Sequence, residues 1–238
     1  MTRLRDESGF SLPELLTALI IGMVVLIATK EVLDNTISVG SGVNRRVDAL
    51  QRGRTALEVV TRDLRSQVCV GIDDPAAAGG SSSQPSLIAA TDDSVDFYVD
   101  LGDGTTARPP ERRTIVFDPS AQTIEERIYR PTGGAGNYVF PATPTSTRTL
   151  ISDVAQDGST PIFRYYAFDT QTPPTPSAPL PASSGLSSTD TARTARTAIA
   201  FRALSENGSS TGAASLHDDV YRRAVDPNKT ILTPECAS

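Results

Sequence analysis

Glu14 is the residue in this sequence whose position most clearly calls for a chemical partner. It is the only charged side chain in the twenty residues from Phe10 to Thr29, which are mostly apolar. About 20 apolar residues in a helix span the ~30 Å hydrocarbon core of a bilayer. A carboxylate within such a span costs about 2.5–3.5 kcal/mol near mid-bilayer. Glu14 therefore either lies at the interface, where the span begins one turn late, or pairs with a cation inside the membrane.

Few other residues have the types and spacing that catalysis or metal binding requires. His217 is the only histidine, so a Ser-His-Asp triad with a spare base and a multi-histidine metal site are both difficult to build. We expect it at the surface, on a strand edge. Asp100, Asp103 and Gly104 could offer oxygen ligands to calcium, but a β-turn explains Asp-Gly equally well. We therefore predict that the protein is not an enzyme and holds no cofactor or metal.

The residues around Glu14 form a motif, Gly9-Phe10-Ser11-Leu12-Pro13-Glu14-Leu15-Leu16, that follows a short polar leader. This motif resembles the prepilin cleavage and methylation site of type IV pilins and of the pseudopilins of type II secretion systems. The resemblance implies that a membrane prepilin peptidase cuts between Gly9 and Phe10, and that Phe10 is then N-methylated. It also implies that Glu14 pairs with the new N-terminal amine of a subunit in the growing filament.

The membrane topology depends on the same motif. A secretory signal peptide has a similar basic and apolar order, but Thr29-Lys30-Glu31-Val32 offers no small-x-small cleavage pattern after the apolar run. We therefore expect the run to be retained. Two arginines precede the span and three basic residues follow within about 20 residues, so the positive-inside rule does not decide the orientation. The resemblance implies a single-pass protein of the bacterial inner membrane with an extracytoplasmic head.

Composition bounds the remaining part of the chain. Of 238 residues, roughly 200 lie beyond the span, and 17 Gly with 17 Pro favour a single loop-rich domain that contains β-strands. A net charge of -6 argues against nucleic-acid binding by the whole surface and leaves room for a local basic patch. Cys69 and Cys236 are the two cysteines. Disulfides persist outside the cytoplasm, so we expect these two to pair.

The N-terminal helix is predicted to continue past the membrane as far as Val68. Apolar residues follow at helical spacing along one stripe: Val43, Val47, Leu50, Leu57, Val60, Leu64 and Val68. Opposite this stripe, Asp48 with Arg52 and Glu58 with Arg62 are spaced to form i,i+4 ion pairs. Gly40 and Gly42 interrupt the pattern, and each weakens a helix by about 1 kcal/mol relative to Ala.

We predict an α+β fold in which a long N-terminal helix packs on an antiparallel β-sheet head. The predicted segments are a cleaved cytoplasmic leader 1–9, a transmembrane segment 10–29, an amphipathic helix 30–68, a turn-rich linker 69–91 and the β head 92–238. Alternation and β-branched or aromatic residues predict strands at 94–101, 114–117, 123–129, 162–168, 197–204 and 220–224. We expect 162–168 to be central and 172–188, rich in Pro and Ser, to be an exposed mobile loop.

A finer resemblance concerns the helix continuation and the last strands. The helix pattern is similar to that of large minor pilins and J-type minor pseudopilins through Gln51, Arg52, Arg54, Ala56, Leu57, Asp63, Leu64 and Arg65. An ordinary amphipathic helix explains the same residues. The family often ends its last strand with Arg-Asn, whereas here Ala224 follows Arg223.

Taken together, these resemblances imply a minor pilin or pseudopilin at or near a filament tip. Its partners would be other pilins or pseudopilins, contacted through the N-terminal helix, and an inner-membrane assembly platform. The alternative is a membrane-tethered extracytoplasmic domain that binds a ligand or adheres and does not assemble.

Overall fold

The computed structural model describes residues 11–73, 81–101, 109–134, 138–169 and 175–222. The chain divides between Asn44 and Arg45 into two compact units. The first contains the N-terminal part of helix α1 (Leu12–Arg65), and the second, which we call the head, contains the rest of α1 and every described strand. The helix continues through both glycines in its middle and ends three residues before the predicted end.

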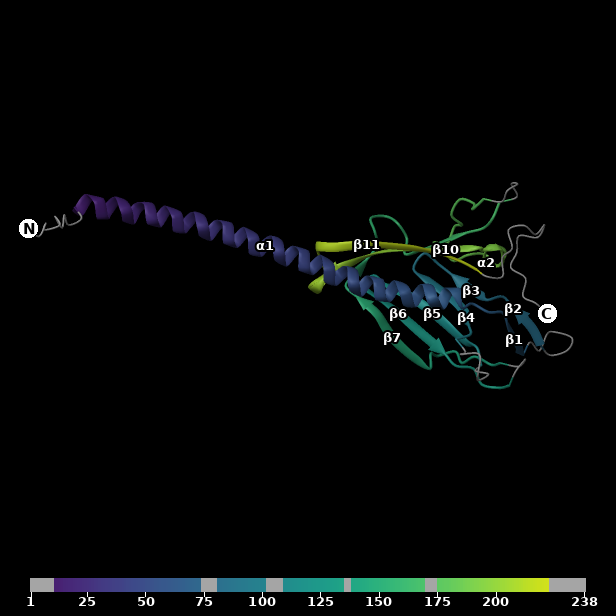
Figure 1. Cartoon of the computed structure of the whole chain (residues 1–238). Coiled ribbons are helices and arrows are strands. Elements are labelled where there is room, and N and C mark those ends of the chain that lie inside the picture. The colour runs from purple at the N-terminus through teal and green to yellow at the C-terminus, as the bar shows by residue number, and fades with distance from the viewer. Residues whose placement is uncertain (1–10, 74–80, 102–108, 135–137, 170–174, 223–238) are drawn as a thin grey trace, which may run out of the picture. The chain divides into compact units, whose positions relative to one another are not determined.

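Two antiparallel sheets and a small hairpin make up the β part of the head (Figure 1). The larger sheet has the order β3 (Leu87–Ala90), β4 (Ser94–Val99), β5 (Glu111–Asp118), β6 (Thr123–Tyr129) and β7 (Ser146–Ser152). The other is centred on β10 (Arg196–Ser205), which pairs on one edge with β11 (Ser209–Tyr221) and otherwise with β8 (Val154–Ala155) and β9 (Phe163–Tyr166). The hairpin joins β1 (Val70–Asp73) and β2 (Ser81–Gln84). The predicted α+β class is confirmed.

The strands predicted at 114–117 and 123–129 are confirmed as β5 and β6, which pair as a hairpin. Its tight turn depends on Asp118, whose Oδ1 accepts hydrogen bonds from the backbone N–H groups of Ser120 at 2.8 Å and Ala121 at 3.0 Å. Gln122 then takes a positive φ of 54° before β6 begins. Asx turns of this type need only local residues, so the sequence was sufficient to place the hairpin. The connection after the predicted strand at 197–204 is a single 3-10 turn (Glu206–Gly208).

The structure corrects two of the predicted segments. The linker predicted at 69–91 contains β1, β2 and β3, and β3 belongs to the larger sheet, so the head begins before residue 92. The sequence pattern of β3 was a run of only four residues next to a Gly- and Ser-rich stretch. The predicted central strand at 162–168 is the four-residue β9, which pairs with β10 alone. Its aromatic residues are nevertheless buried, by packing against other parts of the head. Tyr165, for example, is fully buried, and its hydroxyl donates to the carbonyls of Thr91 and Ser94.

The mobile loop predicted at 172–188 is also corrected, over its described part from residue 175. Leu180 and Ala182 are 8% and 3% exposed and belong to the hydrophobic core. The N–H of Leu180 donates to the carbonyl of Tyr165 in β9, and the N–H of Leu186 donates to the carbonyl of Ala90 in β3. The segment therefore joins the two sheets and leads into the short helix α2 (Ser188–Arg193). Apolar residues between its prolines pack this segment into the hydrophobic core, although they show no periodicity.

The face of α1 that packs in the head is lined mainly by small side chains. Its buried apolar positions are Ala49, Gly53, Ala56, Val60 and Leu64. Of the predicted stripe, Val43 and Val47 are exposed, and Leu50 and Leu57 are only partly buried. Val60 and Leu64 of that stripe are buried as predicted. Before them, small residues allow the helix backbone to approach the sheets closely, so the packed face there runs through Ala49, Gly53 and Ala56 instead of Val47, Leu50 and Leu57.

We expect Gly53→Val to destabilise the head by about 1–3 kcal/mol, because overpacking of a filled core forces side chains and backbone to shift. A Cβ at Gly53 would lie 2.6 Å from Cδ1 of Leu216 and 3.1 Å from Cβ of Ala203. Denaturant unfolding of the full chain in detergent, followed by tyrosine fluorescence, measures this loss. Gly42→Val is the matched control, since nothing lies within 4 Å of its Cβ position. Equal midpoints for the two variants would contradict the close approach at Gly53.

Candidate functional site

Glu14 lies in the first turn of α1, where its backbone and side chain contact Ser11. Its N–H donates to the carbonyl of Ser11 at 3.0 Å, and the hydroxyl of Ser11 lies 3.5 Å from Oε2 of Glu14. The spacing Ser-x-x-Glu is that of a capping box, although here the Ser11 hydroxyl donates to the Glu14 carboxylate and the N–H of Glu14 bonds to the Ser11 carbonyl. A carboxylate here also interacts favourably with the helix dipole. Glu14 therefore has a local structural role that does not depend on any partner.

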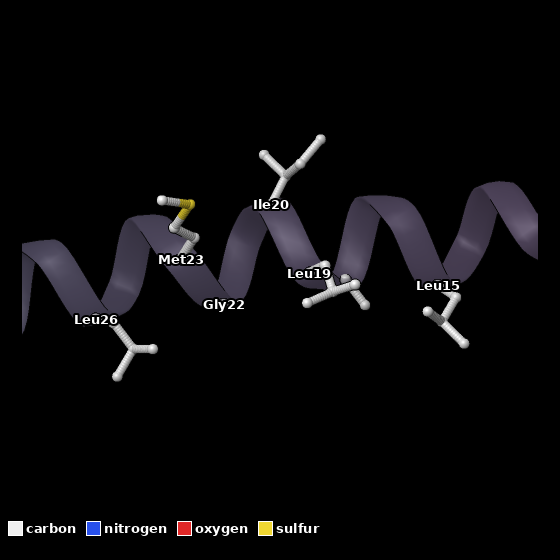
Figure 2. Close-up of a pocket in the computed structure, with 7 residues that line it drawn as sticks. Leu15, Leu19, Ile20, Gly22, Met23 and Leu26 are labelled. Atoms are coloured by element: carbon white, nitrogen blue, oxygen red, sulfur yellow. The ribbon is translucent and has the colours of Figure 1, made fainter.

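Directly after Glu14, α1 presents apolar side chains that nothing in the described chain covers. The helix is long and apolar enough to cross a membrane, and none of its most apolar 18-residue window is buried. Figure 2 shows Ile20 and Met23 on one side of the ribbon, Leu15, Leu19 and Leu26 on the other, and Gly22 between them without a side chain. A groove on this part of the helix is lined by Leu15, Ala18, Leu19, Ile20, Gly22, Met23 and Leu26. These residues present a smooth apolar surface suited to lipid or to another apolar helix.

Several other predicted site residues lie outside the residues that the structure describes. Gly9 and Phe10 lie outside the described residues, so cleavage and N-methylation stay predictions. Cys69 is described and is not a free thiol, whereas Cys236 lies outside the described residues. Their pairing also stays a prediction. Asp103 and Gly104 fall in the undescribed range 102–108.

No group of three His, Cys, Asp or Glu residues that could hold a metal ion occurs in the described part of the chain. His217 is exposed on β11, the outer strand of its sheet, as the sequence predicted. The neighbouring carboxylates take part in ion pairs instead, Asp218 with Arg65 of α1 at 3.8 Å and Asp219 with Arg196 of β10 at 3.1 Å.

A buried ionic cluster fixes α1 to the larger sheet, and the sequence analysis missed it. Arg113 of β5 donates from Nη1 to Asp63 of α1 at 2.8 Å and to Glu126 of β6 at 2.6 Å, and from Nη2 to Glu111 at 2.6 Å. Asp63 and Glu126 are both fully buried. Arg148 of β7 adds a second contact to Glu126. The signal was present as charged residues at core positions of two strands, but alternation alone assigns such residues to the solvent.

The environment of this cluster shifts the protonation of Glu126. Burial raises the pKa of its carboxyl above the ordinary value, and the nearby Asp63 carboxyl adds to the rise, while Arg113 and Arg148 oppose it. For Arg113, burial alone would lower the pKa, but its three carboxylate partners outweigh burial and raise it. The arginine thus stays charged, and Glu126 takes up a proton more readily than an ordinary glutamate does.

The Asp48–Arg52 pair predicted on the helix is confirmed at 3.0 Å, and Arg52 does more than the sequence indicated. Its Nη2 donates to the carbonyl of Leu204 in β10 at 2.9 Å, and its Nη1 donates to the carbonyl of Ser152 in β7. A residue assigned to a solvated face therefore connects α1 to both sheets. The other predicted pair is replaced, because Arg62 donates to the neighbouring Asp63 rather than to Glu58.

Among solved structures, this chain is similar to a chain of the GspK-GspI-GspJ complex from the type 2 secretion system of enterotoxigenic Escherichia coli. The alignment covers 75% of this chain and 99% of the matched chain, at 14% identity and a TM-score of 0.40. At these values the similarity concerns the fold alone. No family model and no curated protein matches the chain.

Proposed function

We propose that this protein is a prepilin-like minor pilin or pseudopilin, a non-enzymatic subunit of a type IV pilus or of a type II secretion pseudopilus. Before assembly it is anchored in the bacterial inner membrane by the apolar part of α1, with the head outside the cytoplasm. The prepilin peptidase cleaves it between Gly9 and Phe10 and the new N-terminus is methylated. It then joins a filament at or near the tip.

The observation that carries this proposal is the position of Glu14. It is the single charge of the apolar run, it lies in the first turn of α1, and the residues that follow it in the run are all exposed. The only side-chain contact of its carboxylate among the described residues is the Ser11 hydroxyl at 3.5 Å from Oε2, which leaves the carboxylate charge without a cation there. A cation supplied at this depth offsets much of the cost of placing the carboxylate in an apolar surrounding.

Cleavage before Phe10 would create such a cation, because it frees an amine four residues from Glu14. The amine of one subunit and Glu14 of a neighbour would neutralise each other when the apolar parts of their helices pack together. Other pilins or pseudopilins are the partners in this step, and the inner-membrane assembly platform is the partner that adds the subunit. The head packs its own core from Ala49 onward, so it folds without taking part in this contact.

We expect Glu14→Gln to abolish assembly while cleavage and the fold of the head stay unchanged. Gln can replace Glu in a capping box, so the helix start is preserved, but Gln cannot neutralise the amine. The measurement is the amount of assembled filament, or its secretion, uptake or adhesion output, in a strain that lacks the native copy. N-terminal mass spectrometry of the variant should still give methyl-Phe10.

Glu31→Gln is the matched control, since Glu31 is an exposed carboxylate of α1 beyond the apolar run. It should assemble normally. Assembly of Glu14→Gln at the wild-type level would remove the ion-pair mechanism and favour the membrane-tethered domain that does not assemble.

A further inference from the structure

Arg222, directly after β11, is a buried cation without a carboxylate partner among the described residues. It is 4% exposed, and burial lowers the pKa of its guanidinium to about 10, with no carboxylate opposing this shift. Arg113 is similarly buried, at 7% exposed, but it forms ion pairs with three carboxylates. A buried charge is costly unless it is paired. Arg222 therefore lacks the counter-charge that the same head supplies to Arg113.

The bonds that Arg222 makes leave one edge of its guanidinium free. Nη1 donates to the carbonyls of Thr194 at 2.8 Å and Thr191 at 3.4 Å. Nη2 donates to the hydroxyl of Ser86 at 2.7 Å. A guanidinium has five N–H groups, so one N–H of Nη2 is left, and Nε is buried without a hydrogen-bond partner. Nε and Nη2 share one edge, and two parallel N–H groups on an edge match the two oxygens of a carboxylate.

The end of α2 supplies only part of the negative charge that Arg222 requires. Thr191 lies in the last turn of this six-residue helix, and Thr194 is its C-cap. Cations are favourable at such a position, but the partial charge at the end of a full helix amounts to about half an elementary charge. These carbonyls explain where Arg222 lies, and they leave its Nε–Nη2 edge unoccupied. A carboxylate would both neutralise the cation and fill that edge.

Hydrogen bonds connect Arg222 to the chain just after α1. The hydroxyl of Ser86, which accepts from Arg222, donates in turn to Oε1 of Gln67 at 3.3 Å. Gln67 precedes Cys69 by two positions. Arg222 is therefore two side-chain hydrogen bonds away from the segment that contains Cys69.

The sequence beyond Arg222 contains the carboxylates that could complete this site. Sixteen residues follow it, outside the described part of the chain, and their acidic side chains are Asp226 and Glu235. Glu235 directly precedes Cys236, so the predicted disulfide to Cys69 would hold Glu235 close to Arg222. Asp226 has no comparable tether.

We propose that the carboxylate of Glu235 binds the Nε–Nη2 edge of Arg222 and completes a buried ion pair. The contact fastens the segment 223–238 to the head beside α2, at a second point in addition to the predicted disulfide. It lies within one copy of the chain, so it goes beyond the proposed filament function and does not depend on it.

Glu235→Gln in the full chain should lower the folding equilibrium constant of the head about tenfold or more, the range for a hydrogen bond to a charged group. Gln keeps the shape of the side chain but does not neutralise the guanidinium. Urea unfolding at pH 7 in detergent without reductant, followed by tyrosine fluorescence, measures the change. Asp226→Asn is the matched control, since it removes the other carboxylate of the segment, and should leave the constant unchanged. A loss in Asp226→Asn instead, or in neither variant, would overturn the proposal.

Arg222→Met tests whether this loss depends on the arginine. The variant leaves the carbonyls of Thr191 and Thr194 without their donor, so it is destabilised by itself. In its background Glu235→Gln should cause no further loss, because changes to two partners of one contact are not additive. The same loss in both backgrounds would show that Glu235 acts elsewhere.

Hydrogen–deuterium exchange observes the segment directly and needs no variant at Arg222. Peptides that cover 230–238 should exchange about tenfold faster in Glu235→Gln than in wild type or Asp226→Asn, because local opening becomes easier. Unchanged exchange would leave Arg222 as a cap of α2 alone and overturn the proposal. Two free thiols in the denatured, unreduced protein would also overturn it, since the tether is the reason for choosing Glu235. Wild-type filament assembly by Glu14→Gln would overturn the proposed function and leave this contact unaffected.

Discussion

Arg113→Met should lower the free energy of unfolding of the head by about 3–5 kcal/mol, the range for removing one partner of a buried ion pair. Met is apolar and has a side chain of similar length, so the substitution removes the cation and leaves Asp63 and Glu126 facing each other in the core. Both carboxylates are fully buried, and Nη1 of Arg113 is 2.8 Å from one and 2.6 Å from the other. Denaturant unfolding at pH 7 measures the loss.

The loss should become smaller as the pH falls. Since the pKa of Glu126 is raised above its ordinary value of 4.5 in the folded protein, the folded state holds this proton more tightly than the unfolded state. The stabilising contribution of Glu126 is therefore present at low pH and is lost as the pH rises through its folded pKa. Removal of Arg113 takes away a cation that opposes the rise, so the raised pKa moves further up. Arg113→Met should then lose more stability relative to wild type at pH 7 than at pH 5.

Arg130→Met is the matched control for this prediction. Arg130 is 3.2 Å from Glu111 of the same cluster, but its side chain is 62% exposed. Exposed ion pairs contribute about 0–1 kcal/mol. If Arg113→Met loses no more free energy of unfolding than Arg130→Met, or if its loss grows as the pH falls, the cluster does not hold α1 on the sheet as an ionic unit.

Reduction of a Cys69–Cys236 disulfide should destabilise the head by about 2–4 kcal/mol, the usual range for such bonds. The bond would close a loop of 168 residues, counted from 69 to 236, for which the chain-entropy model gives roughly 5 kcal/mol as an upper figure. Cys69 is held near β4, because the N–H of Val68 donates to the carbonyl of Tyr98 at 3.1 Å. The bond would thus tie the chain beyond β11 to the end of α1.

Urea unfolding with and without reductant tests this disulfide. Cys69→Ser combined with Cys236→Ser should match the reduced wild-type protein and should no longer respond to reductant. The reach is sufficient, since Arg222 and Gln67 both bond to the hydroxyl of Ser86. Cys236 follows Arg222 by 14 positions, and an extended chain covers about 3.3 Å per residue. Two free thiols in the denatured, unreduced wild-type protein would refute the pairing.

The features that the sequence alone determined are those set by neighbouring residues. The apolar run after Glu14 defines a helix that can span a membrane, whatever the rest of the chain does. The β5–β6 hairpin follows from alternation on both sides of Asp118, whose side chain organises the turn locally. The motif from Gly9 to Leu16 is likewise recognised from the spacing of its residues along the chain. Each of these depends on contacts within a few residues, which is why periodicity and turn chemistry were enough.

The tertiary structure decided which face of α1 is packed and which charges are buried. Close approach at Gly53 places the small face of the helix against Leu216 and Ala203, although longer aliphatic residues formed the more obvious stripe. Asp63 and Arg113 are 50 residues apart in the sequence and acquire a role only when α1 meets β5. Leu180 is likewise buried because a distant partner holds its segment: its N–H bonds to the carbonyl of Tyr165 in β9, and no local sequence pattern predicts this. Burial of small, charged or irregularly spaced residues depends on partners that are distant in the sequence, and a pattern read along one chain does not contain that information.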